Sequence, residues 1–427
     1  MTVETQEKGY KELESMTNIL RSILKHRKNQ PTIQSEELYY ESLLNYCDRI
    51  LAAKANGKML VGHSVMFPVE LLYAFDLVPL NLETLSGTLT ILSQSFSNTL
   101  SAAAQYGLAQ EVCSTYRVLM GAVIRQTLPQ PDFIVWSSQV CDNTARTWEI
   151  LTEYYRVPGF FLDRPFRRSK KEEAYLIKEM KKLICFLEEQ TKTKFDYDKF
   201  KEVMQYSIRS MELCHEVCNL RKRFPSPLRN RTIVNSMTIE WILSGTPDAT
   251  RYFQTVKDEA QMISQMEPKA NAKAKERYRL LCLYLPPLYD LKVLDWLQQE
   301  FGASIVMDLL SLWELEPDMA PEKPLEALGK KIFLRPDARL SHGPGEILVN
   351  EIVSRAREFH LDGAIFFAHI GCRQSGAMIR SLREGLQKEL GLPYSVIDMD
   401  TMDPSFSSIP EIKSKLEGFF EILEEHK

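Results

Sequence analysis

Residues 362–400, DGAIFFAHIGCRQSGAMIRSLREGLQKELGLPYSVIDMD, form the stretch that decides the fold of this chain. The stretch opens with the apolar run 363–369, which is too short for a core helix and is typical of a buried parallel strand. After Cys372, apolar residues recur at helical spacing until a Gly-Leu-Pro sequence ends the helix, and residues 394–397 then predict a second strand. The stretch therefore predicts a strand–loop–helix–strand unit with a cysteine where the first strand passes to the helix.

A second stretch repeats this arrangement earlier in the chain. Residues 133–137 predict a short apolar strand, Cys141 follows it, and a helix and the strand 160–162 come next. The N-terminus of a helix carries positive partial charge and free N–H groups, which favour a thiolate or an anionic metal cluster. A single cysteine is usually a small buried hydrophobe. Two cysteines in matching positions, Cys141 and Cys372, are harder to explain in that way.

Composition and charge indicate an ordinary globular protein. The chain has 427 residues, 44% of them hydrophobic and 26% charged, enough for two or three domains. A net charge of −4 gives no reason to expect nucleic acid as a partner. No basic segment followed by an apolar run and no apolar stretch of about 20 residues occurs, so we expect a cytoplasmic protein with no membrane span. In that reducing compartment, its eight cysteines favour metal or redox chemistry over disulfides.

The order of strand and helix patterns divides the chain into four parts. We predict an N-terminal helical segment (1–55), a first α/β domain (56–168), a helical bridge (169–273) and a second α/β domain (274–427). Strands that alternate with helices favour parallel sheets. The predicted fold class is thus α/β, with two Rossmann-like parallel-sheet domains, a helical N-terminal segment and a helical middle insert.

Several common chemistries lack their motifs. The sequence has no GxGxxG after a strand, no GxxxxGK[ST], no HExxH, no GxSxG and no paired CxxC, which argues against nicotinamide oxidoreductases, P-loop NTPases, zincins and thioredoxin-like proteins. Cys214 and Cys218, one turn apart on a predicted helix, form either half a metal site or, more commonly, two half-buried cysteines. The basic run 164–171, RPFRRSKK, either contacts a phosphate or a partner or is a solvated helix start.

Four stretches in a fixed order connect the chain to a known family. They are GHSVMFPVELLYAFDLVPLNLE (62–83), EVCSTYRVLMGA (111–122), VCDNTARTWEILTEYYRVPGFFLDRP (140–165) and residues 362–404, which extend the opening stretch by TMDP. Together they resemble the 2-hydroxyacyl-CoA dehydratase subunit family, which also includes subunits of ATP-dependent benzoyl-CoA reductases. The resemblance covers most of the chain from about residue 55.

The resemblance implies an iron–sulfur site. In the family, three cysteines per subunit ligate one [4Fe–4S] cluster, and the matching positions here are Cys113, Cys141 and Cys372. Cys113 also precedes a predicted helix, so all three thiolates could lie at helix starts and face one cleft. Three protein ligands leave one iron open for substrate or solvent. The alternative is three unrelated buried cysteines.

The resemblance also implies a reaction and partners. It points to one subunit of a heterodimeric, oxygen-sensitive lyase that dehydrates a 2-hydroxyacyl-CoA to an enoyl-CoA through a ketyl radical, after receiving one low-potential electron. The implied partners are a homologous second subunit, an ATP-hydrolysing iron–sulfur activator and the acyl-CoA substrate. Alternatives are a subunit of an aryl-CoA (benzoyl-CoA-type) reductase, a non-catalytic subunit that relays electrons or scaffolds its partner, and a plain interaction protein without metal.

Acid–base residues are expected near the opening motif of the family. His63, Ser64 and Glu70 lie on the matching loop and helix start and are the catalytic candidates. Gly-His-Ser stands here where the family can have Trp-Ser-Ala, and no arginine follows Asp403-Pro404. For Glu70, the alternative is a carboxylate stabilised by the helix N-terminus. His369 either donates a hydrogen bond to a cluster sulfur or packs at the strand end.

Overall fold

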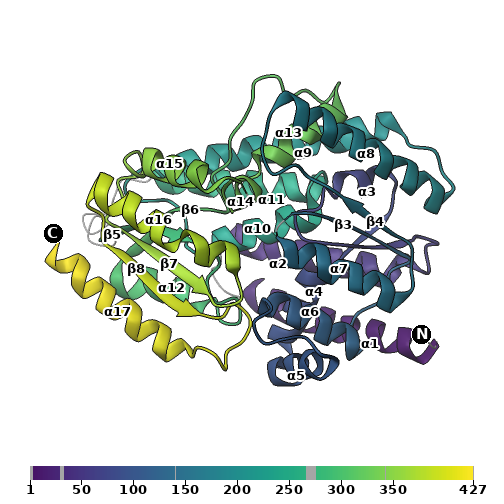
Figure 1. Ribbon diagram of the computed structural model, residues 1–427, viewed down its shortest axis with the longest axis horizontal. Coiled ribbons are helices and arrows are strands. Elements are labelled where there is room, and N and C mark those ends of the chain that lie inside the picture. Colours follow the sequence, from purple (N-terminus) through teal and green to yellow (C-terminus); the bar gives the residue numbers. More distant parts are fainter. Residues whose placement is uncertain (1–2, 29–32, 140, 266–275, 342, 427) are drawn as a thin grey trace.

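Two four-stranded parallel sheets organise the protein, as the ribbon of the computed structural model shows (Figure 1). The structure describes residues 3–28, 33–139, 141–265, 276–341 and 343–426. The predicted α/β class with two parallel-sheet domains is confirmed. The domain boundaries proposed from the sequence stay a prediction.

The first sheet has the order β2-β1-β3-β4. Its strands are β1 (Leu60–His63), β2 (Val78–Asn81), β3 (Phe133–Ser137) and β4 (Gly159–Leu162). All neighbouring strands are parallel. The chain moves outward in one direction from β1 and then in the other from β3, so a topological switch point lies between these two strands. Ligands of open α/β sheets bind at the carboxyl ends of the strands at such a point.

The second sheet repeats this topology with the order β6-β5-β7-β8. Its strands are β5 (Tyr278–Leu283), β6 (Ala303–Asp308), β7 (Gly363–His369) and β8 (Tyr394–Met399). Here the switch point lies between β5 and β7. The strands β3 and β7 therefore have the same place in their two sheets, as the repeated sequence pattern predicts.

Helices cover both faces of the first sheet. Alternate residues of its buried strands enter different cores, because successive side chains of a strand point to opposite faces. Phe133 packs with one core and Ile134 with the other. The helices within this part of the chain are α3 (Glu70–Ala74), α4 (Leu82–Leu92), α5 (Phe96–Tyr106), α6 (Ser114–Ile124) and α7 (Asp142–Tyr155).

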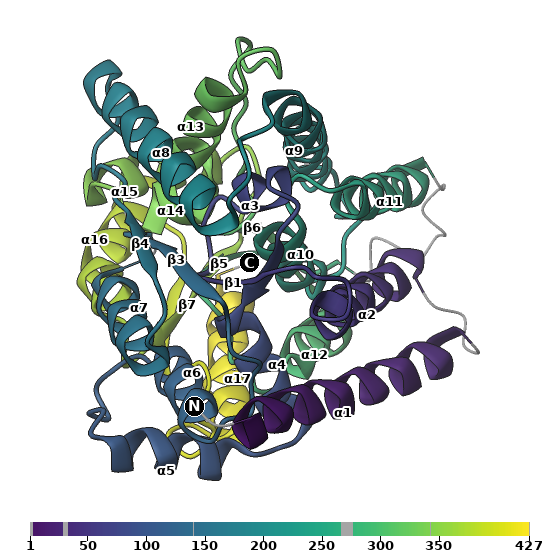
Figure 2. The same cartoon turned by 90° about the vertical axis from the view of Figure 1, so that its right-hand side faces the viewer.

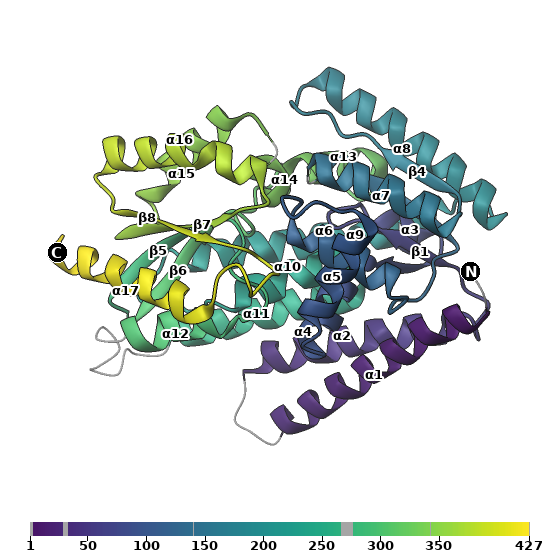
Figure 3. The ribbon, with the colours of Figure 1, turned by 60° about the horizontal axis from the view of Figure 1, so that its bottom comes forward.

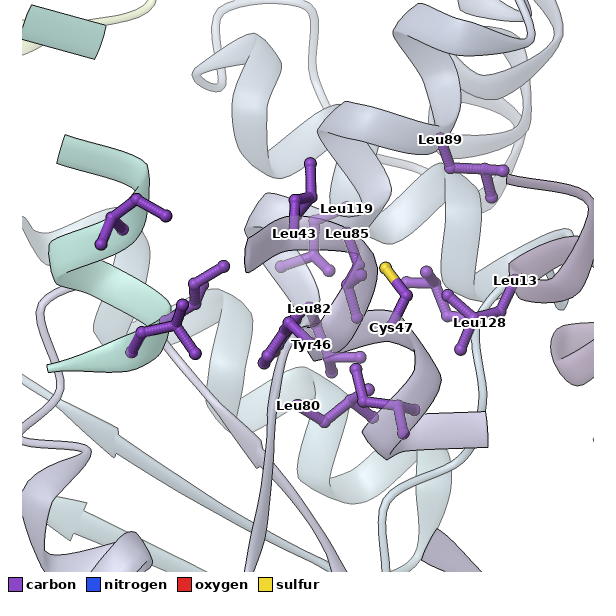
Figure 4. Close-up of a cluster of buried hydrophobic side chains, with 14 of the residues drawn as sticks. Leu13, Leu43, Tyr46, Cys47, Leu80, Leu82, Leu85, Leu89, Leu119 and Leu128 are labelled. Atoms are coloured by element: carbon purple, nitrogen blue, oxygen red, sulfur yellow. The ribbon is translucent and has the colours of Figure 1, made fainter. Parts of the chain in front are cut away.

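The N-terminal helices α1 (Val3–Lys28) and α2 (Gln34–Ala53) lie side by side beneath the first sheet (Figure 3). Their apolar faces join a core that includes Leu13, Tyr46 and Cys47 together with Leu80 of β2 (Figure 4). Cys47 is a small apolar member of this core, far from any polar cluster of cysteines.

The middle of the chain supplies four helices that connect the two sheets. They are α8 (Lys170–Thr191), α9 (Tyr197–Leu220), α10 (Thr232–Leu243) and α11 (Pro247–Gln265), and α9 and α11 are seen at the upper right of Figure 2. Helix α10 contributes Val234 and Met237 to the core of the second sheet, and Ile239 and Ile242 to a core of the first. The two sheets are thus joined through shared apolar packing as well as through the chain.

Two pairs of helices cover the second sheet, α15 with α16 on one face and α12 with α17 on the other (Figure 3). Of the remaining helices, α13 packs with α8 and α9 against the first sheet, and α14 contacts both α13 and α15. In chain order these helices are α12 (Lys292–Phe301), α13 (Pro324–Leu334), α14 (Pro336–Ser341), α15 (Gly345–Ala356), α16 (Arg373–Leu390) and α17 (Ile409–Glu425). In the part of the chain that the structure describes, no helix is both long enough and apolar enough to cross a bilayer.

Helix α4 is among the elements that the sequence analysis does not predict. Helix α4 starts directly after β2, where Asn81 caps it by accepting a hydrogen bond from the amide of Thr84 at 2.9 Å. Its interior holds glycine and β-branched residues, which have low helix propensity. Tertiary burial of residues such as Leu85 and Leu89 stabilises the helix instead.

Candidate functional site

Three cysteines cap three helices. Cys113 precedes α6, Cys141 precedes α7 and Cys372 precedes α16, each as the N-cap residue. The thiol of Cys372 accepts a hydrogen bond from the amide of Ser375 at 3.4 Å. Cys141 follows β3 and Cys372 follows β7, so both lie at the carboxyl end of the strand at the switch point of their sheet.

All three cysteines line one cavity of about 250 Å³, which we call the cysteine cavity. Most of its remaining wall is apolar, including Val65, Met66 and Leu285. The first two cysteines come from the domain of the first sheet and the third from that of the second. The structure therefore brings together the three cysteines that the sequence singles out.

Close contacts between the helix starts hold the cysteines near one another. Gly371 lies so close to Cys113 that a Cβ atom on this glycine would be 2.7 Å from the Cys113 Cα. Only a residue without a side chain fits there. At the neighbouring pair of helices, the carboxylate of Asp142 accepts hydrogen bonds from the side chains of Arg373 and Gln374, the second at 3.3 Å.

His369 contacts Cys113 directly. Its Nε2 lies 3.1 Å from the Cys113 sulfur, and its Nδ1 accepts a hydrogen bond of 3.4 Å from the amide of Thr401. Burial lowers the pKa of the imidazole, although the nearby Asp400 raises it. A neutral ring whose Nδ1 accepts carries its proton on Nε2, so His369 donates to the sulfur. The two roles considered from the sequence, a hydrogen bond to a cluster sulfur and packing at the strand end, both stay predictions.

A buried ion-pair group lies behind His369 and joins the two domains. The carboxylate of Asp400 lies 3.7 Å from His369 Nδ1 and 3.4 Å from the guanidinium of Arg117, which also pairs with Asp403 at 3.3 Å. Arg117 belongs to α6 of the first domain, whereas both aspartates follow β8 of the second. This group fixes the start of α6, and with it Cys113, against the second domain.

Burial dominates the electrostatics of the thiols. It raises the pKa of Cys113 to about 12, with further contributions from Cys141 and Cys372, and it also raises the pKa of Cys141. The helix N-termini alone therefore do not keep these groups ionised at neutral pH. A bound metal cation would overcome the effect of burial, because a thiol that coordinates a metal is deprotonated.

One carboxyl group in the cavity is missing from the sequence candidates. Glu83, at the start of α4, is 3% exposed and accepts hydrogen bonds from the indole of Trp148 at 2.6 Å and from the amide of Val65 at 3.3 Å. Burial raises its pKa to about 7, against the lowering effect of both hydrogen bonds. A group with this pKa can both accept and donate a proton near neutrality. Its signal in the sequence is an acidic residue directly after a buried strand.

The predicted acid–base residues do not line this cavity in the described part of the chain. His63 is fully buried with Nδ1 3.0 Å from the carbonyl of Ser64, and burial lowers its pKa to about 4. Its Nε2 has no hydrogen-bond partner among the described atoms. The hydroxyl of Ser64 accepts a 3.4 Å hydrogen bond from the amide of Ser137. Both residues lie at the carboxyl end of β1 and directly precede Val65 and Met66, which line the cavity.

Glu70 belongs to a different buried group. Its carboxylate pairs with Lys331 at 2.7 Å and accepts hydrogen bonds from Ser207 at 2.7 Å and Ser244 at 3.0 Å. Burial opposes ionisation, but Lys331 and these hydrogen bonds outweigh it and hold the pKa of Glu70 at about 2. Lys331 also pairs with Glu240 at 2.8 Å. Glu70 thus connects the first domain to the bridge and to α13, as a permanently ionised carboxylate.

The other cysteines are dispersed. Cys214 and Cys218 are buried on α9 beside apolar neighbours, and burial raises the pKa of both. Cys282 is buried in β5 and Cys185 is exposed on α8. Across the described residues, no three His, Cys, Asp or Glu side chains are grouped to hold a single metal ion. A cluster of several irons gives each thiolate its own iron, so its ligands need not converge on one point.

Comparison with known proteins places this geometry in context. A family model described as 2-hydroxyglutaryl-CoA dehydratase, D-component, matches residues 64–423. The chain is 22% identical to the (R)-phenyllactyl-CoA dehydratase alpha subunit of Clostridium sporogenes, over 74% of this chain and 78% of the relative. It is also 22% identical to the (R)-2-hydroxyisocaproyl-CoA dehydratase alpha subunit of Clostridioides difficile, over 88% and 92%. A benzoyl-CoA reductase subunit of Thauera aromatica is 23% identical, over 90% and 93%.

Proposed function

The chain belongs to the 2-hydroxyglutaryl-CoA dehydratase D-component family, and we propose that it is the subunit of an oxygen-sensitive enzyme that removes water from a 2-hydroxyacyl-CoA at a [4Fe–4S] cluster. The observation that supports this best is the cysteine cavity, in which three cysteines from three helix starts line one mainly apolar space. The names of the relatives supply the substrate class.

Cys113, Cys141 and Cys372 would hold the cluster. The fit rests on the chemistry of the donors: thiolates are the usual ligands of iron–sulfur clusters, and the positive ends of three helices offset the negative charge of such a group. When bound, the cluster supplies one low-potential electron and an iron open to the substrate. The apolar wall keeps water away from this space, and His369 donates its Nε2 proton to the Cys113 sulfur.

Glu83 would move the proton. Dehydration of a 2-hydroxyacyl group removes a β-hydrogen and a hydroxyl, so it needs a group that accepts a proton and can return it to the leaving oxygen. Glu83 is the carboxyl of the cavity wall with a pKa near 7, held in place by Trp148 and Val65. In this proposal Glu70 holds the domains together and His63 and Ser64 support the cavity wall.

The partners follow from the same reasoning. The dehydratase relatives are named alpha subunits, so we propose a homologous second subunit for this chain. An ATP-hydrolysing iron–sulfur activator would deliver the electron. An aryl-CoA reductase is the second candidate, because the relative from Thauera aromatica is covered along almost its whole length.

The first experiment asks whether the cysteines hold iron. Anaerobic purification from iron-supplemented cells should give about four irons and four sulfides per chain for the wild type. Cys113→Ser, Cys141→Ser and Cys372→Ser should each lose most of this iron, whereas Cys185→Ser, at an exposed position on α8, should keep it. A colourless wild-type protein, or equal iron in all five proteins, would refute the cluster.

A second experiment separates the candidate reactions. The loaded protein, reconstituted with its second subunit and activator, is offered a panel of 2-hydroxyacyl-CoA esters and benzoyl-CoA under reducing conditions. Enoyl-CoA products support the dehydratase, and reduced ring products support the aryl-CoA reductase. A fully loaded protein that converts none of these esters, and whose spectrum does not respond to them, would indicate a subunit that only relays electrons or scaffolds its partner.

A further inference from the structure

A second cavity of about 430 Å³ adjoins the cysteine cavity, and we call it the arginine cleft. Cys141, Ser341 and Gln374 line both spaces, so the two are separated by a shared wall. The arginine cleft is bounded by the segments that follow β3 and β4 and by the starts of α15 and α16. It lies at the carboxyl end of the first sheet, where α/β proteins bind ligands.

Arg164 is the unusual residue of this cleft. It is 9% exposed, and its Nε is buried without a hydrogen-bond partner in the described structure. The guanidinium stacks on Phe333, with its Cζ 4.9 Å from the ring centre. Its backbone is fixed by Ser138, whose hydroxyl accepts a 2.7 Å hydrogen bond from the Arg164 amide. The cation therefore lines the cleft on a support formed by Phe333 and Ser138.

Comparison with the other buried cations shows what Arg164 lacks. Each of the other buried Arg and Lys side chains in the described chain forms an ion pair within 4 Å of a carboxylate. They are Arg117, Arg221, Arg279, Lys331 and Arg335. For Arg164 the described residues provide no such pair. The carboxylate that acts on the pKa of Arg164 is that of Asp337. Asp337 itself pairs with Arg335 at 3.2 Å and accepts a hydrogen bond from the indole of Trp241 at 3.1 Å.

The isolated charge is costly. Desolvation lowers the pKa of Arg164 to about 10, only partly opposed by Asp337. A buried charge normally requires a partner of opposite sign. Retaining a guanidinium here, on a rigid support, is understandable if an anion from outside the chain completes the site. Arginine is suited to this role because its planar N–H donors match phosphate and carboxylate oxygens.

The opposite side of the cleft also favours an anion. Helix α15 begins at Gly345, which lines the cleft, and its preceding residue Pro344 has no side chain that could accept hydrogen bonds from the first turn. The amides of Ile347 and Leu348 donate to the Pro344 carbonyl, which leaves those of Gly345 and Glu346 as the free donors of this helix N-terminus. The N-terminus of a helix favours negative charge. The exposed ring of Phe166 lies at the same cleft and gives an apolar surface beside the charge.

We propose that the arginine cleft binds an anionic group of the substrate, with Arg164 as the residue that recognises it. This inference rests on the proposed function for the identity of the anion: either a phosphate of CoA or a carboxylate at the far end of the acyl group. It divides the basic run noted in the sequence. Arg164 lines the cleft, whereas Arg168, which also lies over the Phe333 ring, does not line it and pairs with Glu173 and Glu316.

Calorimetric titration of the anaerobically purified chain tests this proposal. Arg164→Gln should weaken the binding of acetyl-CoA or of glutaryl-CoA roughly ten- to a hundredfold, since a hydrogen bond to a charged group is lost. Arg164→Lys should recover part of the affinity. Arg168→Gln, in the same loop, should bind as the wild type does. Thermal melts of all variants verify that each is folded.

The choice of ligands separates the two anions. If CoA phosphate occupies the cleft, acetyl-CoA is weakened by Arg164→Gln and S-acetylpantetheine is not. If an acyl carboxylate occupies it, glutaryl-CoA is weakened and butyryl-CoA is not. Either result supports the anion site. Folded Arg164→Gln that binds every one of these ligands as the wild type does would overturn it.

Failure of the proposed function would look different. A wild-type protein that binds no CoA ester, yet binds inorganic pyrophosphate or glutarate in a manner that requires Arg164, would overturn the CoA-ester function and keep the anion site. If the wild type and Arg164→Gln bind CoA esters equally well, the CoA-ester function is kept and the anion site is overturned. A wild type that binds none of these anions would overturn the site as well.

Discussion

Replacing Lys331 by methionine should destabilise the protein strongly. Lys331 is 1% exposed and lies between two buried carboxylates, at 2.7 Å from Glu70 and 2.8 Å from Glu240. Methionine keeps most of the volume but removes the charge. Glu70 retains its hydrogen bonds from Ser207 and Ser244, and Glu240 retains a longer contact of 3.7 Å to Arg335. Both carboxylates remain buried and lose their closest cation.

The size of the effect follows from the pKa of Glu70. Its fall from 4.5 to about 2 corresponds to about 3 kcal/mol of stability at neutral pH, at about 1.4 kcal/mol per pKa unit. Breaking a buried ion pair by removing one partner costs about 3–5 kcal/mol. We therefore expect Lys331→Met to lower the free energy of unfolding by about 3 kcal/mol or more at pH 7. Lys330→Met should cost less than about 1 kcal/mol, because the neighbouring Lys330 pairs with carboxylates nearer the surface.

The contribution of Glu70 to stability should depend on pH with opposite signs in the wild type and in Lys331→Met. In the wild type the folded pKa of Glu70 lies below the unfolded value, so its contribution is complete above pH 4.5 and is lost as the pH falls towards about 2. In Lys331→Met the effect of burial is no longer outweighed by the cation, so the pKa of Glu70 should rise above its unfolded value. The deficit of the variant should therefore be smallest at the lowest pH at which both proteins fold, and it should grow as the pH rises.

Urea unfolding of wild type, Lys331→Met and Lys330→Met at several pH values measures both effects, with circular dichroism as the signal. The double variant Glu70→Gln/Lys331→Met should recover part of the loss, because one of the buried carboxylates is neutralised. A deficit below 1 kcal/mol at pH 7, or one that shrinks as the pH rises, would refute the assignment of Glu70 to a structural ion pair. Loss of activity in a fully stable Glu70→Gln would restore its catalytic candidacy.

Three further perturbations test the cavity. Trp148→Phe removes the indole donor to Glu83, which should raise the pKa of that carboxyl and move the acidic limb of the activity–pH profile upward by up to about one unit; an unmoved profile would argue against Glu83 as the proton-transfer group. Gly371→Ala introduces a Cβ atom 2.7 Å from the Cys113 Cα, so we expect a lower melting temperature and reduced iron content, with equal values counting against the close approach. His369→Leu removes the N–H donor to the Cys113 sulfur and should make the reduction potential of the cluster more negative in a spectroscopic redox titration, while an unchanged potential would contradict that hydrogen bond.

The local units were predictable from the sequence because their signals are local. The apolar run, the cysteine and the helical spacing after it all lie within about 30 residues, and β7, Cys372 and α16 follow that order. The same holds for β3, Cys141 and α7. Parallel sheets then follow from the alternation of strands and helices. The match of the two units in sequence reflects the equal place of β3 and β7 in their sheets.

Long-range pairings were not predictable in this way. Glu70 and Lys331 are separated by 261 residues, and periodicity carries no information on which buried carboxylate meets which buried cation. The sequence therefore shows Glu70 only as a carboxylate at a helix start and gives no sign of its buried cation. Glu83 was missed for a different reason. It lies in the first turn of α4, a helix of weak propensity that was absent from the prediction, so its carboxyl could not be assigned to a cavity.

The origin of the three cysteines has a mechanical consequence. Cys113 and Cys141 are carried by one domain and Cys372 by the other, so their sulfurs meet only while the domains keep their present spacing. The site therefore depends on the arrangement of the two domains, and the distance between its thiols reports on that arrangement. A short bifunctional thiol reagent should crosslink Cys141 to Cys372 while the domains keep this arrangement. The crosslink should fail if the domains move apart. Neither half of the chain, made separately, would contain all three cysteines.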